Sequence, residues 1–326
     1  MILNAEQIKT IANGVAYWED GPEGGLIPRR FCKAQETEYS SHEAHFLRTR
    51  ATSGIRLECR TDASALEVSF RAFAGSAKNW YGFDLKINGQ LYAHSEGTLQ
   101  ETDRIHWEQQ LPPGEKKLQL YLPCLTGVEI LGVTLRDATA CEKVDYHEKI
   151  LVMGDSITQG YSSHFPSMTY VAQMAAHRNA DYMNQAIGGE VFHPEIITPL
   201  EWKPTMAIIA YGSNDWALKD RQRLIEDGGA FLERFHALYP TLPTVVITPV
   251  WRADGPTRRS DNFRIEETDG ILQAIVAKYP NMRAVCGQKL LPKIKELLDD
   301  VAHPNELGFT VYAKRLCDAM DKLTWE

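Results

Sequence analysis

The chain has 326 residues, of which 44% are hydrophobic and 24% are charged, and it carries a formal net charge of −8. This composition is typical of a folded globular protein and excludes disordered, collagen-like and low-complexity chains. The mild acidic excess argues against binding of a nucleic-acid backbone as the main task, and the length leaves room for two domains.

The start of the chain shows no targeting segment. Its first ten residues contain no basic stretch followed by an apolar stretch, so no secretory signal is predicted. No window reaches the roughly 18 apolar residues of a membrane span. The six cysteines form no CxxC pair, which favours reduced thiols over a disulfide scaffold. We therefore expect a cytoplasmic protein without a membrane span.

The first part of the chain has the two-residue period of half-buried strands. Apolar and polar residues alternate through 66–72 and again through 83–87. Asn-Gly at 88–89 follows, and this pair between alternating runs is typical of a hairpin, because a type I′ turn needs positive φ at both positions. Further runs lie at 118–122 and 130–135. We predict that residues 1–143 form an antiparallel, jelly-roll-like β-sandwich with almost no helix.

The pattern changes near residue 144, where continuous apolar runs alternate with stretches of helical period. Such runs are typical of parallel strands buried on both faces. The predicted strands are 149–154, 206–211, 244–250 and a short one near 285. The predicted helices are 166–179, 231–238, 265–279 and 304–323. Residues 144–326 are therefore predicted to be an α/β domain with helices on both faces of a parallel sheet.

Polar segments stand where ligands bind in such sheets, at the carboxyl ends of the strands. They are 154–160, 184–190, 211–215 and 300–305. These segments contain what acyl transfer requires. Ser156 is a candidate nucleophile, His303 a base, and Asp300 an acceptor that could orient the imidazole. The backbone N–H groups of Ser156 and Gly189 and the side-chain amide of Asn214 could stabilise an oxyanion.

These four segments, in this order, resemble the SGNH hydrolases, also called GDSL esterases. The resemblance covers residues 148–326 and implies a flavodoxin-like three-layer parallel sheet. It also implies Ser156, Asp300 and His303 as the catalytic residues, and Gly189 and Asn214 as the oxyanion residues. Thr158 stands where a GxSxG elbow would have its second glycine, which argues against the ordinary α/β-hydrolase fold.

The first domain carries a looser resemblance. Tyr81-Gly82-Phe83-Asp84-Leu85 and Tyr121-Leu122-Pro123 look like parts of the β-sandwich that precedes the hydrolase domain in some carbohydrate acetylesterases. This resemblance implies that the partner is a small-molecule or oligosaccharide ester. It gives no reason to expect an organic cofactor. A metal is not expected either, because the sequence contains no HxH or HExxH spacing.

Several assignments have alternatives. Gly188 could replace Gly189, Asp299 could replace Asp300, and His193 is an alternative base. The resemblance favours Gly189, because Asn184 and Glu190 then fall in register.

Aromatic residues near the strand ends could form a platform for a sugar or could simply pack. Trp216, Trp251 and Arg252 stand directly after strands, and Trp80 and Tyr81 belong to the sandwich. Asp155 and Asp215 are interpreted as structural.

Three functions fit the sequence. The first is a serine esterase that removes small acyl groups such as acetyl from a carbohydrate through an acyl-enzyme. The second is an acyltransferase that uses the same residues, and the third is a glycan-binding protein with a vestigial hydrolase domain. Whether the chain forms a homo-oligomer cannot be read from its residues.

Overall fold

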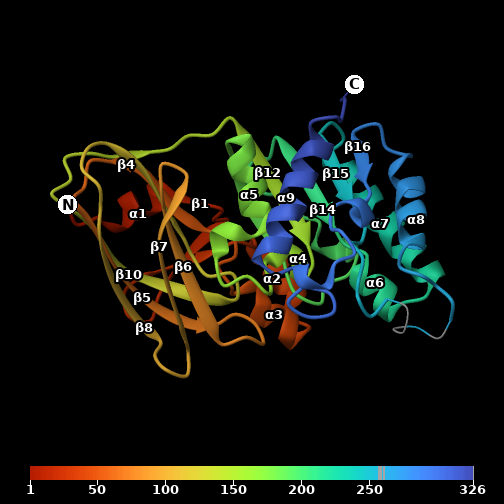
Figure 1. Ribbon diagram of the computed structural model, residues 1–326, viewed down its shortest axis with the longest axis horizontal. Coiled ribbons are helices and arrows are strands. Elements are labelled where there is room, and N and C mark those ends of the chain that lie inside the picture. Colours follow the sequence, from red (N-terminus) through yellow and green to blue (C-terminus); the bar gives the residue numbers. More distant parts are fainter. Residues whose placement is uncertain (256–258, 260, 326) are drawn as a thin grey trace.

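The computed structural model describes residues 1–255, 259 and 261–325. Two β-sheets occupy the end of the molecule that holds the N-terminus, and a third sheet flanked by helices occupies the other end (Figure 1). The strands change from antiparallel to parallel between β11 (Cys141–Lys143) and β12 (Glu148–Gly154), near the predicted change of domain. The division of the chain at residues 143 and 144 itself stays a prediction.

The described residues form a parallel sheet of five strands in the order β13-β12-β14-β15-β16. Its strands are β12, β13 (Ala180–Ala186), β14 (Met206–Ala210), β15 (Thr244–Ile247) and β16 (Met282–Val285). In chain order this arrangement reads 2-1-3-4-5, the order of flavodoxin-like sheets. The predicted α/β fold is confirmed.

Helices cover both faces of this sheet. One face carries α5 (Tyr170–Arg178) and α9 (Glu306–Met320), and the other carries α7 (Arg221–Leu238) and α8 (Glu267–Val276). Ile150 and Val152 of β12 point into the first core, whereas Leu151 and Met153 point into the second. The strand is apolar throughout because alternate side chains enter two separate cores.

Shorter helical elements complete this half. The single-turn helix α4 (Ser156–Gln159) and α6 (Ser213–Leu218) follow strand ends. The 3₁₀ turns are η1 (Pro166–Met168), η2 (Pro194–Ile196), η3 (Gly287–Lys289) and η4 (Lys295–Leu297). Three predicted helix starts are wrong. The helix expected from Pro166 begins at Tyr170 after η1, and the helix expected from residue 231 begins at Arg221. The last helix begins at Glu306 rather than Pro304, because Asn305 is its N-cap.

Two antiparallel sheets form the N-terminal half, as predicted. One has the order β1-β4-β9-β6-β7 with β11 paired to β4, and the other has the order β2-β3-β10-β5-β8. The bounds are β1 (Ala12–Asn13), β2 (Tyr17–Asp20), β3 (Leu26–Arg29), β4 (Arg56–Thr61), β5 (Ala65–Ala74), β6 (Trp80–Ile87), β7 (Gln90–Thr98), β8 (Arg104–Gln110), β9 (Lys116–Tyr121) and β10 (Thr126–Arg136). The predicted hairpin joins β6 to β7, with φ 50° at Asn88 and 84° at Gly89.

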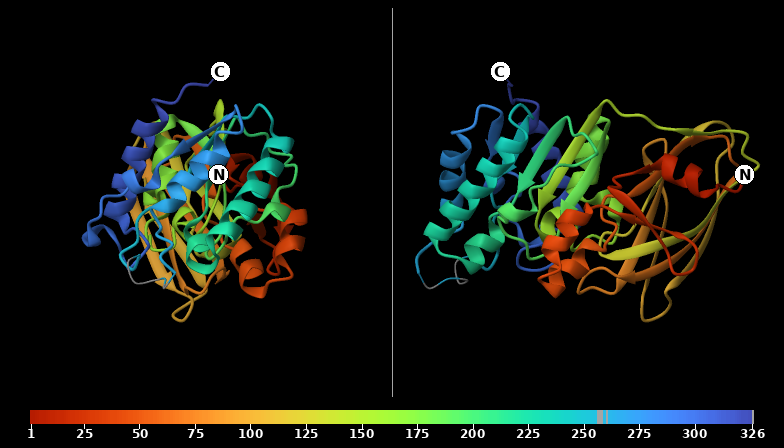
Figure 2. Two further views of the ribbon diagram at one scale, coloured as in Figure 1. Left: turned by 90° about the vertical axis from the view of Figure 1, so that its right-hand side faces the viewer. Right: turned by 180° about the vertical axis from the view of Figure 1, so that it is seen from behind.

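The sequence predicts almost no helix in this half, and this prediction is wrong. The half contains the helices α1 (Ala5–Ile11), α2 (Lys33–Tyr39) and α3 (Glu43–Thr49). Helices of seven residues are too short to show a clear helical period in the sequence. Figure 2 shows from behind that α2 and α3 lie against the α/β half. Phe31 and Tyr39 share a hydrophobic cluster with Leu151 and Met153 of β12, so this early segment contributes to the core of the α/β half.

Candidate active site

Ser156 is the first residue of α4, directly after β12. The side chain of Asp155 caps this helix by accepting from the Ile157 N–H at 3.0 Å. Asp155 is only 4% exposed, and this burial raises its pKa to about 7. The cap sets the turn that places the Ser156 hydroxyl at the carboxyl edge of the sheet, and Asp155 is structural in this arrangement, as interpreted from the sequence.

His303 lies beside Ser156, although 147 positions separate them in the chain. Its Nε2 is 2.7 Å from the Ser156 hydroxyl, and its Nδ1 is 2.8 Å from Asp300 Oδ2. The other carboxylate oxygen of Asp300 accepts from the backbone N–H of Ala302 at 2.7 Å and of His303 at 2.8 Å. Partial burial opposes ionisation of Asp300, but these donors and the His303 ring together lower its pKa.

Asp300, rather than Asp299, is the neighbour of the imidazole. The backbone N–H of Asp299 donates to the His303 carbonyl at 2.8 Å, which closes the loop that carries the histidine. The geometry is that of a hydroxyl, an imidazole and an orienting carboxylate in series.

Two potential oxyanion donors come from different loops. Gly189 has φ 82°, a conformation that favours glycine, and a Cβ there would lie 3.0 Å from Arg48 Nη1. Within the described part of the chain, its N–H has no acceptor at hydrogen-bonding distance. The Asn214 side-chain amide donates one hydrogen to the Glu190 carbonyl at 2.9 Å, which leaves its second hydrogen for a ligand.

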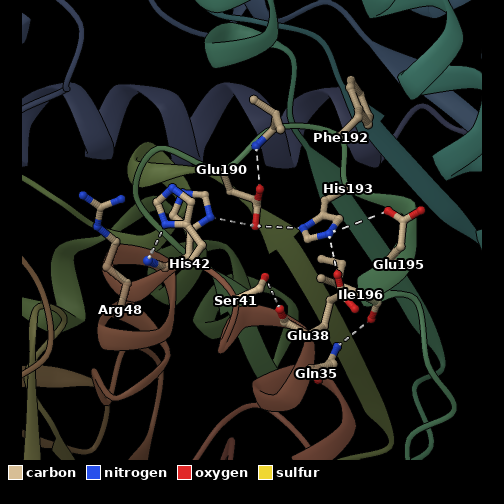
Figure 3. A network of polar contacts seen from close by, with 12 residues as sticks. Gln35, Glu38, Ser41, His42, Arg48, Glu190, Phe192, His193, Glu195 and Ile196 are labelled. Atoms are coloured by element: carbon tan, nitrogen blue, oxygen red, sulfur yellow. Dashed lines mark hydrogen bonds and ion pairs between the residues drawn. The ribbon is translucent and has the colours of Figure 1, made fainter.

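Hydrogen bonds and ion pairs from neighbouring segments hold the loop that carries Gly188, Gly189 and Glu190. Gln159 Oε1 accepts from the Gly188 N–H at 2.7 Å, so the segment that starts with Ser156 also fixes the glycine loop. Glu190 is 1% exposed, and its carboxylate accepts from the Val191 N–H at 3.0 Å. It also lies 3.9 Å from His45 and 3.7 Å from His193 (Figure 3). Burial opposes the charge of Glu190, but His193, Val191 and His45 lower its pKa.

A cavity of about 290 Å³ opens over Ser156. Most of its lining comes from the segments predicted from the sequence, and it includes Gly189, Asn214 and His303. Arg48, Ser76 and Ala77 of the N-terminal half also line it. Sequence reasoning missed these three residues, because nothing in their local pattern indicates that residues more than 70 positions before Ser156 approach it.

The aromatic candidates have structural roles. Trp216 is fully buried and donates from Nε1 to the Phe263 carbonyl at 2.8 Å, and Trp251 is 6% exposed. Arg252 does line the cavity and pairs with Asp254. Both tryptophans therefore pack in the interior and do not line the cavity. Arg252 does line the cavity, as one of the two interpretations of the sequence expected.

The remaining candidates lie away from the hydroxyl. Trp80 stacks on the ring of His164, with centroids 4.1 Å apart, and Tyr81 is 4% exposed. His193 pairs with Glu190, Glu38 and Glu195, and it does not face the cavity. Asp215 is fully buried and accepts from the Phe192 N–H at 3.2 Å, as expected for a structural residue.

The described residues contain no cluster of three or more His, Cys, Asp or Glu side chains that could hold a metal ion. No helix in the same part of the chain has the length and apolar character needed to cross a membrane.

Residues 152–311 match the family model of the GDSL-like Lipase/Acylhydrolase family. No curated protein sequence matches this chain. Solved structures do match, although identities of 20% or less show similarity of fold alone.

One similar structure is the salicylyl-acyltransferase SsfX3 from a tetracycline biosynthetic pathway, with 20% identity and a TM-score of 0.79 over 96% of this chain and 95% of that chain. A second is a family two carbohydrate esterase from Clostridium thermocellum in complex with cellohexaose, with 14% identity and a TM-score of 0.68 over 95% and 98% of the two chains. A third is the acetyl xylan esterase Est2A from the rumen bacterium Butyrivibrio proteoclasticus, with 15% identity and a TM-score of 0.66 over 98% and 97%.

Proposed function

Because its α/β domain belongs to the GDSL-like lipase/acylhydrolase family, we propose that this protein is a serine esterase that removes acetyl or similarly small acyl groups from a carbohydrate. The observation that carries the proposal is the series of contacts from Ser156 to His303 to Asp300, at 2.7 and 2.8 Å, at the floor of a cavity. A serine is a weak nucleophile until a base removes its proton, and this geometry supplies that base.

The proposed reaction has two halves. In the first, His303 takes the proton of Ser156 as the hydroxyl oxygen attacks the ester carbonyl. The resulting oxyanion accepts from the N–H groups of Ser156 and Gly189 and from the Asn214 amide. The intermediate then expels the alcohol, which takes the proton from His303, and leaves an acyl-enzyme. In the second half, a water molecule gives a proton to His303 and attacks the acyl group. The second tetrahedral intermediate then collapses to the acid as His303 returns the proton to the Ser156 oxygen.

The expectation of a small acyl group on a sugar draws on two kinds of support. A cavity of about 290 Å³ is at the small end of the range for ligand sites, which favours a small acyl group on part of a sugar. Two of the similar structures are named as a carbohydrate esterase bound to cellohexaose and an acetyl xylan esterase.

The direct test replaces the nucleophile. Ser156→Ala should lower kcat for 4-nitrophenyl acetate by roughly 10⁴-fold or more while leaving the melting temperature close to that of the native protein. Ser41→Ala, at an exposed serine that does not line the cavity, is the matched control and should retain native turnover. Retention of most activity by the Ser156 variant would refute the proposal.

Acyl transfer is a second candidate, because one similar structure is named an acyltransferase. The same residues would form the same acyl-enzyme, and a sugar hydroxyl would then replace water as the acceptor. Adding glucose or xylose to a reaction with 4-nitrophenyl acetate separates the two functions. A hydrolase releases acetate throughout, whereas a transferase produces the acetylated sugar in place of acetate.

We also infer that the N-terminal sandwich is a jelly roll. Its strands β3 to β10 divide into the orders β3-β10-β5-β8 and β4-β9-β6-β7, and the chain crosses repeatedly between the two sheets. The turn after β5 brings Ser76 and Ala77 to the cavity. We propose that this domain helps to bind the substrate.

A further inference from the structure

Arg48, near the end of α3, forms one side of the cavity over Ser156. Its Nη1 donates to the Gly188 carbonyl at 2.6 Å, and the same nitrogen would lie 3.0 Å from a Cβ at Gly189. A Cβ at Gly188 would lie 3.6 Å from Ser156 Cβ and 3.9 Å from Arg48 Cδ. The guanidinium therefore lies directly beside the glycine loop, where the reacting ester group would bind.

This guanidinium has no carboxylate partner in the part of the chain that the structure describes. Within the described residues, no Asp or Glu oxygen lies within 4.0 Å of the Arg48 nitrogens. Glu190, one residue after Gly189, pairs with His45 and His193 instead (Figure 3). By contrast Arg252, the other arginine on the cavity, makes two hydrogen bonds of 2.9 Å with Asp254.

Two arginines, Arg48 and Arg252, line the cavity. Among its described lining residues, the carboxyl group is that of Asp155, whose pKa is raised to about 7 by burial, so its charge is incomplete near neutral pH. Lys78, directly after the lining residue Ala77, lies 4.9 Å from the centre of the Tyr161 ring at the cavity wall. Of the two arginines on the cavity, Arg48 is therefore the one whose charge is available to attract an anionic ligand.

Arg48 is also held in place before any ligand arrives. The buried guanidinium of Arg30 donates to the Arg48 carbonyl at 3.0 Å and to the Ala186 carbonyl at 2.6 Å. These bonds tie the end of α3 to β13, two residues before the glycine loop. A preorganised guanidinium loses little entropy on binding, and its planar donors match the two oxygens of a carboxylate.

We propose that Arg48 binds a carboxylate of the substrate, so that the preferred esters of this protein are anionic. The shared chemistry is an acyl ester with a carboxylate close to the ester bond. The carboxylate can be on the alcohol, as in an acylated uronic acid, or on the acyl group, as in a half-ester of a dicarboxylic acid. This inference rests on the proposed ester hydrolysis at Ser156.

The kinetic test uses two pairs of esters that differ in one charge. The alcohol-side pair is 4-acetoxybenzoate and 4-acetoxybenzamide, and the acyl-side pair is mono-4-nitrophenyl glutarate and its methyl ester. The native protein should have the higher kcat/KM for the anionic member of at least one pair. Arg48→Gln should lower that value roughly 10- to 100-fold, the worth of a charged hydrogen bond, and change the neutral member less than about threefold.

Two further variants separate binding from folding. Arg48→Lys keeps the positive charge and should restore part of the preference for the anion. Arg50→Gln is the matched control, because Arg50 follows α3 directly but lies over the Phe46 ring and near Glu19 rather than in the cavity. It should leave the ratio between anionic and neutral esters unchanged.

Two kinetic results would overturn the inference. One is a native enzyme that prefers the neutral member of both pairs. The other is an Arg48→Gln variant that slows both members of a pair equally, which would instead assign Arg48 to the reaction's oxyanion.

A binding experiment separates this inference from the proposed function. In Ser156→Ala, 4-acetoxybenzoate and 4-acetoxybenzamide remain intact, and an NMR titration measures their affinities without turnover. The anion should bind more tightly, and adding Arg48→Gln should remove the difference. If the native protein hydrolyses no ester, the proposed function fails, yet this titration still decides whether Arg48 selects an anion. Equal affinities for the two ligands would refute the inference.

Discussion

The imidazole of His303 is held between a hydroxyl and a carboxylate, and the carboxylate is itself held by backbone donors. Asp300 accepts from the N–H groups of Ala302 and His303 with one oxygen and faces the ring with the other. This arrangement selects the ring tautomer whose Nε2 can accept the serine proton.

We expect Asp300→Asn to lower kcat by roughly 10²- to 10⁴-fold, because an amide can stabilise the wrong tautomer and cannot balance the imidazolium charge. Steady-state kinetics with 4-nitrophenyl acetate measure the change, and a thermal melt confirms folding. A variant with more than half of the native kcat would show that Ser156 and His303 work without an orienting carboxylate.

A second histidine provides a test of stability against pH. Burial opposes protonation of His193, but the carboxylates of Glu190, Glu38 and Glu195 raise its pKa. Because the pKa of His193 is raised in the folded state, its pairing with these carboxylates stabilises the protein fully at pH values below the unfolded-state pKa of about 6.5. The contribution is lost as the pH rises through the folded pKa.

His193→Gln should therefore lower the melting temperature more at pH 5.5 than at pH 9. His147→Gln, at an exposed position, is the matched control and should have little effect at either pH. An equal loss for His193→Gln at both values would mean that the ring stabilises by packing rather than by charge.

At the scale of elements, α4 is a single turn whose two ends are both determined by local residues. Asp155 caps its start, and Gly160 ends it with φ 92°, while the Gly160 N–H donates to the Ser156 carbonyl at 3.1 Å. A Cβ at Gly160 would lie 2.5 Å from Thr169 Cγ2. The position of the serine thus depends on a left-handed residue with no space for a side chain.

Gly160→Ala should destabilise the protein by about 1–3 kcal/mol, from the left-handed backbone and from overpacking. Urea unfolding measures this change. Gly229→Ala is the control, because Gly229 lies within α7 and nothing stands within 4 Å of its added Cβ. That variant should be neutral or more stable by up to about 1 kcal/mol. Similar effects at both positions would contradict the argument.

The elements differ in how well their sequences predict them. The central strand β12 is evident because its residues enter two cores and must all be apolar. The hairpin at Asn88 is evident because few residues adopt its backbone angles. Helices α1, α2 and α3 were missed because seven residues show less than two full repeats of the helical period.

At the scale of the molecule, the early residues complete the α/β half. Phe31 is fully buried and Tyr39 is 1% exposed, both in the cluster that includes Leu151. Arg30 covers the edge of the parallel sheet by donating to the Asn184 and Ala186 carbonyls of β13 at 2.7 and 2.6 Å. The α/β half therefore depends on residues that stand more than 100 positions before it.

We expect residues 144–326 expressed alone to lack a cooperative thermal transition, because they would expose this apolar face and leave the β13 carbonyls without donors. Arg30→Met in the whole chain tests the polar part separately and should destabilise by about 3 kcal/mol, since several buried carbonyls lose their donor. A stable, cooperatively melting fragment would contradict the expectation.

The sequence by itself predicted the local features: many of the strands and the polar segments at their ends. The resemblance of these segments to the SGNH hydrolases then singled out Ser156, Gly189, Asn214, Asp300 and His303. Both depend on periodicity and short motifs, which are visible in neighbouring residues. Only the tertiary structure placed Arg48 against the glycine loop, surrounded Glu190 with His45 and His193, and packed Trp216 away from the cavity. The physical reason is that contacts between residues far apart in the chain are set by how the elements pack, and no local pattern records that packing.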